Sequence, residues 1–399
     1  MSKKIVIISE LFYPSTATTA HILTDVADAL CECMEVEVIT TDSLYDEYAD
    51  ADLKGGTRKP YPITRINSKA YNKNKIFSRI YGLSSSSLKM LLSISRNVKK
   101  GDNVMVVTNP APLLLLVSLL RRFKNFRLTI VVHDVFPENA VAAGIIRNNK
   151  NIFYKLGRLV FNKAYSSADN LVVLGRDMAK VVKDKTASRH KGPTVTVIEN
   201  WSDSLNDSQI KTADFSWNEP LKILYAGNVG RVQGVDKFID AFSEAGNENL
   251  RLEIRGDGAQ AEEVKAKLKN LNTPHISFGE KYARTEQFNI LSDCDIALVS
   301  LVEGMYGLGV PSKAYNIIEA GKPILFIGDP DSEIAMMVRE NGIGYCFNAS
   351  DLEGIRQWLA NLTPQSRKEF REMGRKAREL SKQKYSKASG LEKFKNLFR

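Results

Sequence analysis

The chain has 399 residues, is 43% hydrophobic and 26% charged, and carries a formal net charge of +10. This length predicts two or three globular domains, and without a signal peptide or an apolar run of about 18 residues we expect a cytosolic protein that does not span a membrane. The four cysteines lack the nearby Cys or His partners of a zinc site, so we expect reduced thiols and metal-free chemistry.

In the first half, apolar runs rich in β-branched residues alternate with helical patterns. Strands are predicted at 4–8, 36–40, 103–107, 128–132 and 170–174, and helices at about 20–33 and 153–166. Such alternation is typical of a parallel sheet covered by helices on both faces.

The same architecture is predicted again after a polar stretch, 194–220, that resembles a linker. The second set of strands is predicted at 221–226, 250–254, 275–278, 296–300 and 323–327. The fold class expected is therefore α/β, with two doubly wound domains and a boundary near residue 205. Ligands of such domains bind beyond the carboxyl ends of the strands, so the loops there are the candidate site.

Residues 65–127 hold thirteen Lys or Arg against the single acid Asp102. Three interpretations are open: a nucleic-acid surface, the solvated face of a helix, or an anionic membrane surface. Apolar residues lie between the basic ones, which favours the membrane over nucleic acid as the partner.

Three strand-to-helix loops are informative. The first, 9–19, has no glycine, which counts against a nicotinamide enzyme. The second places His133 and Asp134 at the end of a buried strand, where a histidine can donate to a substrate hydroxyl or a developing charge, although a structural histidine is the alternative. The third has Gly227 and Gly230 between a strand and a helix, where backbone N–H groups can converge on an anion.

Several segments together resemble the family 4 retaining glycosyltransferases of the GT-B fold. They are 226–236, Gly256-Asp-Gly258, 292–297 and 309–323, the last with Pro-Ser-Lys and Gly-Lys-Pro. Residues 108–112 and 133–138 resemble a bacterial subgroup that builds O-antigen and capsule repeat units, some members of which transfer N-acetylated deoxy-aminosugars from UDP donors. The resemblance covers nearly the whole chain. It implies a Rossmann-like acceptor-binding domain at 1–205, a Rossmann-like nucleotide-sugar-binding domain at 206–375, and a helix at 376–399 that crosses back to the first domain.

The resemblance also assigns the diphosphate site. Typical members hold the diphosphate with an Arg and a Lys, but the matching positions here are Asn228 and Gln233. Lys313 of Pro-Ser-Lys is therefore expected to supply the missing charge, since a flexible ammonium serves phosphate as a point charge. The remaining contacts expected at the diphosphate are Arg231 and the backbone of Gly227, Gly230, Gly307 and Gly309.

The nucleotide ribose and the sugar have separate expected contacts. The paired glutamates of the family fall at Leu308 and Asn316, which leaves the ribose to a weaker Asn316 contact or to Glu319 or Glu303. By resemblance His133 would contact the donor sugar, and His133, Asp134 and Lys313 are the predicted catalytic residues.

The expected function is transfer of a sugar from a UDP-sugar, with retention, to a glycan acceptor. The basic amphipathic surface favours a polyprenyl-diphosphate-linked acceptor, and a soluble acceptor stays open. No cofactor, metal or nucleic acid is expected, and the protein is expected at the inner face of the cell membrane as a peripheral protein. Two alternatives stay open. A GT-B-like sugar-nucleotide epimerase would need no acceptor, and a non-catalytic sugar-nucleotide-binding or membrane scaffold protein would bind the UDP-sugar without releasing UDP.

Overall fold

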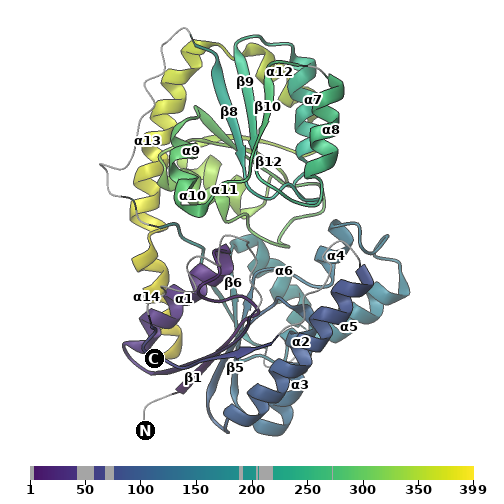
Figure 1. Ribbon diagram of the computed structural model, residues 1–399, viewed down its shortest axis with the longest axis vertical. Coiled ribbons are helices and arrows are strands. Elements are labelled where there is room, and N and C mark those ends of the chain that lie inside the picture. The colour runs from purple at the N-terminus through teal and green to yellow at the C-terminus, as the bar shows by residue number, and fades with distance from the viewer. Residues whose placement is uncertain are drawn as a thin grey trace.

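The computed structural model describes residues 4–42, 58–67, 76–187, 192–203, 205, 219–271 and 273–399. Within these ranges the chain forms two α/β units, each built on a parallel sheet, and they lie one above the other in Figure 1.

The N-terminal unit, in the lower half of Figure 1, contains the first seven described strands and the helices between them. In chain order these are β1 Lys4–Ile8, α1 Thr18–Cys31, β2 Glu35–Thr41, β3 Ile63–Ile66, α2 Ile76–Asn97, β4 Asn103–Val107, α3 Ala111–Lys124, β5 Arg127–Val132, α4 Glu138–Ala142, α5 Ile152–Tyr165, β6 Asn170–Val173, α6 Arg176–Thr186 and β7 Thr194–Val197. The sheet order is β3-β2-β1-β4-β5-β6-β7, with every pair parallel.

The C-terminal unit repeats this plan with six described strands in the order β10-β9-β8-β11-β12-β13. Its elements are β8 Leu221–Ala226, α7 Val235–Ala245, β9 Leu250–Arg255, α8 Ala261–Leu271, β10 Ile276–Gly279, the 3-10 turn η3 Arg284–Glu286, α9 Gln287–Ser292, β11 Ile296–Ser300, α10 Lys313–Glu319, β12 Ile324–Ile327, α11 Glu333–Asn341, β13 Gly344–Phe347 and α12 Leu352–Asn361. In each sheet the strand order reverses at the first strand, between β1 and β4 and between β8 and β11. Ligands of doubly wound sheets bind at such switch points.

Alternate side chains along a strand point to opposite faces of the sheet, and both faces of the N-terminal sheet are covered by helices. In β1, Val6 and Ile8 pack with residues of α2, α3 and α6, whereas Ile5 and Ile7 pack with α1 and the last helix of the chain. All four side chains are fully buried. A strand buried on both faces reads as a continuous apolar run, which is why this strand is evident from the sequence.

Three strands, β3, β7 and β13, are absent from the sequence prediction. The polar stretch at 194–220 was interpreted wholly as linker, and the structure corrects this interpretation because Thr194–Val197 pairs in parallel with β6. All three strands lie at sheet edges, where residues are half-exposed and need no continuous apolar run.

The last two helices connect the units. Helix α13, Arg367–Lys384, contacts α10 of the C-terminal unit, and α14, Lys387–Phe398, packs on α1 of the N-terminal unit (Figure 1). Lys387 Nζ donates to Asp25 at 2.6 Å, and the ring of Trp201 lies edge-on to that of Phe394, with centroids 6.3 Å apart. The C-terminal segment therefore contacts both units, while the predicted boundaries at 205 and 375 stay predictions.

A second connection forms at Asp203, just before the C-terminal unit begins. Its carboxylate contacts His21 of α1 at 2.5 Å and accepts from Arg284 of η3 at 3.2 Å. Although burial opposes it, these two partners hold the pKa of Asp203 at about 2. The two units are thus joined through a carboxylate that is ionised at neutral pH.

Candidate active site

Lys313 is the first residue of α10, and its ammonium is enclosed by protein. The Nζ atom lies 3.6 Å from the centroid of the Tyr225 ring, at the end of β8. It has no hydrogen-bond partner among the described residues. Burial lowers the pKa of Lys313 from 10.5 to about 7. An enclosed cation without a counter-ion is costly, so this position is prepared for an anion that the described residues do not supply.

The loop after β8 lies directly against Lys313. A Cβ placed on Gly227 would be 3.6 Å from Lys313 Nζ, so the lysine and the glycine loop form one site. Gly227 has φ +137° and backs onto Gly256, where a Cβ would lie 1.9 Å from the Gly227 carbonyl oxygen. Glycine is therefore favoured at Gly227 by its positive φ, and it is required at Gly256 by the close approach of the Gly227 backbone.

Two backbone N–H groups of this loop have partners within the protein. The N–H of Gly227 donates to the Arg255 carbonyl at 2.9 Å, and that of Gly230 donates to Gln233 Oε1 at 3.1 Å. Without a ligand, β9 and the Gln233 side chain accept from these two N–H groups, and their predicted convergence on a diphosphate stays a prediction. In this loop Asn228 and Arg231 are exposed, and Lys313 is the enclosed cation.

His133 follows β5, and its imidazole is held by Thr19 in the first turn of α1. Nδ1 lies 3.2 Å from Thr19 Oγ1, and the His133 backbone N–H donates to Thr108 Oγ1 at 3.1 Å. Burial lowers the pKa of His133 to about 4. The ring is therefore neutral at pH 7, and it can exchange a hydrogen bond with a ligand without bringing a positive charge.

Asp134 is fixed by amide donors on both of its carboxylate oxygens. Asn109 Nδ2 donates to Oδ2 at 2.5 Å, and Asn139 Nδ2 donates to Oδ1 at 2.7 Å. Burial raises the pKa of the Asp134 carboxyl, while the two donors lower it. The sequence does not predict the roles of Thr19, Asn109 and Tyr225, because each contacts a residue far from it in the chain. It also misses Asn139, which lies five residues after Asp134.

The two halves of the site meet through the loop between β11 and α10. The N–H of Val135 donates to the Leu308 carbonyl at 3.0 Å. A Cβ on Gly309 would lie 3.5 Å from the His133 carbonyl oxygen and 3.6 Å from Asp134 Oδ1. The structure therefore brings His133, Asp134 and Gly309 together, four residues before Lys313.

Gly307 lies against α6 of the N-terminal unit. Its φ is +64°, and a Cβ there would lie 2.6 Å from Val181 Cγ2 and 2.9 Å from the Asp177 carbonyl oxygen, both on α6. The Gly307 backbone N–H also bonds to the Asp177 carboxylate, whose pKa burial raises and this bond lowers. Gly307 thus packs the loop against the N-terminal unit, while its predicted contact with a diphosphate stays a prediction.

Helix α6 also holds the C-terminal unit through Glu333, the first residue of α11. Arg176 Nε donates to Glu333 at 3.0 Å, and the Glu333 N–H donates to Asp177 Oδ2 at 3.1 Å. Arg176 further pairs with Glu340 at 2.8 Å. These charged contacts fix the position of the Gly307 loop relative to His133.

Glu319 already has partners within the protein, and its predicted contact with the ribose stays a prediction. Its carboxylate is buried, pairs with Arg378 of α13, and accepts from Ser381 Oγ at 2.6 Å and the Leu205 N–H at 2.7 Å. Residues six apart on a helix lie on different faces, so Glu319 and Lys313 point away from each other. Asn316, one turn after Lys313, is buried, and Glu303 is exposed.

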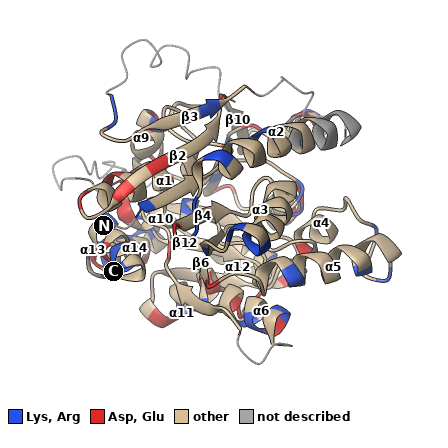
Figure 2. Cartoon of the chain, turned by 90° about the horizontal axis from the view of Figure 1, so that it is seen from below, with Lys and Arg blue, Asp and Glu red and all other residues tan. Residues whose placement is uncertain are grey.

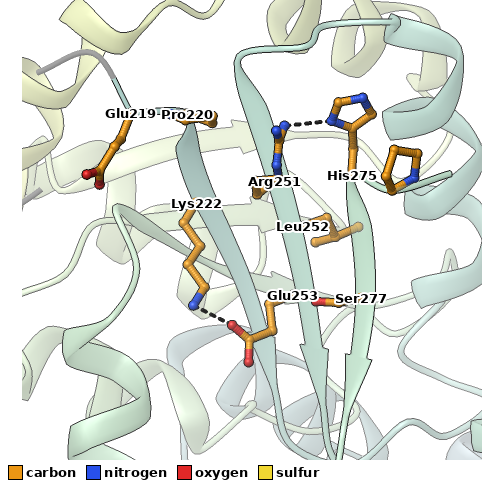
Figure 3. Close-up of a pocket in the computed structure, with 9 residues that line it drawn as sticks. Glu219, Pro220, Lys222, Arg251, Leu252, Glu253, His275 and Ser277 are labelled. Carbon is orange, nitrogen blue, oxygen red and sulfur yellow. Dashed lines mark hydrogen bonds and ion pairs between the residues drawn. The ribbon is translucent and has the colours of Figure 1, made fainter. Parts of the chain in front are cut away.

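A cavity of about 400 Å³ lies at the opposite end of the C-terminal sheet (Figure 3). It is lined at the amino ends of β8, β9 and β10, where Lys222 pairs with Glu253 and Arg251 contacts His275 Nδ1 at 2.6 Å. Its charges are satisfied internally, and ligands of parallel sheets bind at the other end of the strands. We therefore place the site at Lys313.

Two observations bear on metals and membranes. Within the described ranges no group of three or more His, Cys, Asp or Glu residues is arranged to hold a metal ion. None of the helices described is both long and apolar enough to cross a bilayer.

Comparison with known proteins identifies the family. Residues 207–379 match the family described as "Glycosyl transferases group 1". The chain is 34% identical over 331 residues, 81% of its length and 80% of the relative's, to "Probable glycosyltransferase WbjE" of Pseudomonas aeruginosa. The chain belongs to the group 1 glycosyltransferases. This group 1 glycosyltransferase is also 22% identical over 258 residues, 61% of its length and 62% of the relative's, to "Putative colanic acid biosynthesis glycosyl transferase WcaI" of Escherichia coli K12.

The solved structure of Anabaena HepE in complex with UDP shares the fold. The superposition has a TM-score of 0.69 at 13% identity and covers 100% of this chain and 99% of the other. The predicted fold class is confirmed: the group 1 glycosyltransferase has the GT-B fold, with two Rossmann-like units. The predicted membership of the glycosyltransferases is likewise confirmed at the level of the family.

Proposed function

We propose that this glycosyltransferase transfers a sugar from a UDP-sugar to a lipid-linked glycan, with retention of the anomeric configuration. The observation that carries the proposal is the enclosed Lys313 ammonium beside the Gly227 loop, without a hydrogen-bond partner in the described part of the chain. A diphosphate at this position supplies the missing negative charge. The same contact stabilises the UDP that leaves when the glycosidic bond breaks.

The neighbours support the nucleotide and the biological setting. HepE was solved with UDP, and WcaI is named for colanic acid biosynthesis. By resemblance, the sugar is an N-acetylated deoxy-aminosugar and the glycan grows on polyprenyl diphosphate.

The N-terminal loops supply the sugar side of the proposed reaction. Neutral His133, held by Thr19, contacts a sugar hydroxyl, and Asp134 is kept in place by its two asparagines. In this proposal Asp134 orients the sugar and does not act as a covalent nucleophile, because its two amide donors fix the direction of its carboxylate. The acceptor therefore attacks from the face that the UDP leaves, and the departing phosphate takes the acceptor proton. Asn316 serves the ribose through its carbonyl oxygen, and no metal takes part.

The test is a panel of UDP-, GDP- and ADP-sugars assayed for nucleotide release with and without a polyprenyl-diphosphate-linked acceptor, together with thermal shifts by the free nucleotides. We expect a thermal shift with UDP and acceptor-dependent release of UDP. If the protein bound the UDP-sugar but released no UDP with any acceptor, the result would support the non-catalytic alternative. The absence of carboxylates at Leu308 and Asn316 favours that alternative. Conversion of the UDP-sugar without loss of UDP would identify an epimerase.

A further inference from the structure

One face of the N-terminal unit is formed by three helices in a row. Helix α3 contacts α2 on one side and α5 on the other, and all three lie along the same side of the sheet in Figure 1. Their inner faces cover the sheet through residues such as Ile94, Leu114 and Ala164. Their outer surfaces have no further layer of protein in the described part of the chain.

This outer face gathers nearly all of the exposed apolar side chains. Ten of the twelve large hydrophobic residues exposed in the described ranges lie on α2, α3, α5 or the loop before α5. The most exposed are Phe123 at 79%, Phe153 at 75%, Ile152 at 70% and Leu159 at 69%. Single exposed apolar residues are ordinary, but a contiguous group of this kind marks an interaction surface.

The charge of the face is of one sign. Neither α2, α3 nor α5 contains an Asp or Glu, whereas Lys and Arg occur on all three (Figure 2). Arg122, Lys155 and Arg158 lie beside the apolar side chains and form no ion pair with a described residue. The partner of this face must therefore be apolar and anionic together.

A second copy of the chain does not meet this requirement. Two such faces in contact would bury their apolar side chains, but would also bring Arg122, Lys155 and Arg158 of both copies together without carboxylates. An anionic bilayer offers acyl chains to the apolar side chains and phosphate headgroups to the basic ones.

We propose that the outer face of α2, α3 and α5 lies on an anionic membrane, with the side chains of α3 and α5 inserted among the lipids. The inserted residues are Leu119, Phe123, Ile152, Phe153, Leu156 and Leu159. The sequence predicts membrane contact from residues 65–127, of which 68–75 lie outside the described residues. The structure moves the centre of this contact to α5, which is outside that segment.

The face is connected to the candidate active site. Helix α3 begins at Ala111, two residues after Asn109, and Asn109 holds the Asp134 carboxylate. Helix α4 begins at Glu138, four residues after Asp134, and leads to α5. The inference rests on the proposed function only in that a lipid-linked acceptor would enter the cleft from this surface. The contact with lipid itself requires neither donor nor acceptor.

The test is co-sedimentation of the full chain with vesicles, without any nucleotide. Vesicles of phosphatidylglycerol and phosphatidylcholine in equal parts are compared with vesicles of phosphatidylcholine alone. Two double variants remove the proposed contacts, Leu156→Glu with Leu159→Glu and Lys155→Glu with Arg158→Glu. Two matched controls make the same changes elsewhere, Leu271→Glu with Leu352→Glu and Lys368→Glu with Lys376→Glu. Thermal melting shows that each variant is folded.

We expect the wild-type chain to bind the anionic vesicles in preference to the neutral ones. Each α5 variant should weaken this binding by about tenfold or more, and each control should bind as the wild type does. The proposal is overturned if the wild type does not sediment with anionic vesicles, if the α5 variants bind as strongly as the wild type, or if the controls weaken equally. A dimer in light scattering that dissociates in the Leu156→Glu, Leu159→Glu variant would also overturn it and assign the face to self-association. Because no nucleotide is present, failure here leaves the proposed UDP chemistry untouched.

Discussion

The N-terminal and C-terminal sides of the candidate site are prepared in opposite ways. On the N-terminal side, His133 and Asp134 have hydrogen-bond partners in Thr19, Asn109 and Asn139. On the C-terminal side, the Lys313 ammonium is enclosed beside an aromatic ring and has no partner among the described residues. A side chain that is already satisfied can orient a ligand, whereas an enclosed charge that is unsatisfied requires one.

This difference assigns separate tasks to the two sides. The N-terminal groups keep their geometry with or without a ligand, and they are suited to recognise a neutral sugar through hydrogen bonds. Lys313 gains its main interaction only when an anion arrives, and that interaction is strongest when negative charge builds up on the leaving diphosphate. Binding of the nucleotide should therefore depend on Lys313, and the rate of transfer should depend on both sides.

The largest effect is expected from Lys313→Met, which keeps an unbranched side chain but removes the charge. Turnover of the UDP-sugar should fall by about 10²- to 10³-fold, the range found when one stabilising donor is removed from a developing charge. Release of UDP in a coupled assay measures this. Lys237→Met, on an exposed lysine of α7, is the control and should keep wild-type turnover. Equal turnover in both variants would remove Lys313 from the mechanism.

A smaller effect, confined to the rate, is expected from His133→Leu. Turnover should fall by about tenfold to a hundredfold, because a positioned hydrogen-bonding group at the sugar is lost. The dissociation constant for UDP should not change, because UDP is expected to bind at Lys313, on the C-terminal side of the site. His275→Gln removes a histidine at the far end of the C-terminal sheet and serves as the control. If His133→Leu weakened UDP binding as much as it slowed turnover, the division of tasks would be wrong.

Stability without ligand should depend on pH through Lys313. Burial lowers its pKa in the folded state from 10.5 to about 7. Between these values the unfolded chain binds the proton more readily, so the free energy of unfolding contributed by this group rises with pH, with a slope approaching about 1.4 kcal/mol per pH unit. Below pH 7 the contribution is constant and unfavourable. Chemical denaturation of the wild type and of Lys313→Met from pH 6 to pH 10 isolates the effect as a difference, and parallel curves would contradict it.

The smallest effect on nucleotide binding is expected from Glu319→Gln, on the other face of the same helix. The variant breaks the buried pair with Arg378 and should destabilise the fold by about 3 kcal/mol. The affinity of the folded protein for UDP should stay at the wild-type value. Denaturation and calorimetry measure the two quantities separately. A loss of UDP affinity without a loss of stability would instead support a contact between Glu319 and the ribose.

The sequence predicts the central strands because residues such as Ile5 to Ile8 are buried on both faces and form a continuous apolar run. It misses the edge strands β3, β7 and β13, whose residues are mostly half-exposed and form no such run. The expectation for Lys313 comes from the Pro-Ser-Lys segment together with the family resemblance, and its role stays a prediction. The sequence does not show the contacts of Gly307 and Glu319, because their partners, on α6 and on α13, are distant in the chain. A short-range pattern thus locates a loop, but the direction of a side chain depends on contacts that only the folded chain brings together.

The central claim is that UDP supplies the missing partner of Lys313, and proton uptake tests it most directly. At pH 8 the ammonium with a pKa of about 7 is mostly neutral, and a bound diphosphate raises that pKa. Titration calorimetry with UDP, repeated in buffers of different ionisation enthalpy, should show uptake of up to about one proton per site for the wild type. It should show none for Lys313→Met. UDP binding without proton uptake, or with the same uptake in the variant, would contradict the account.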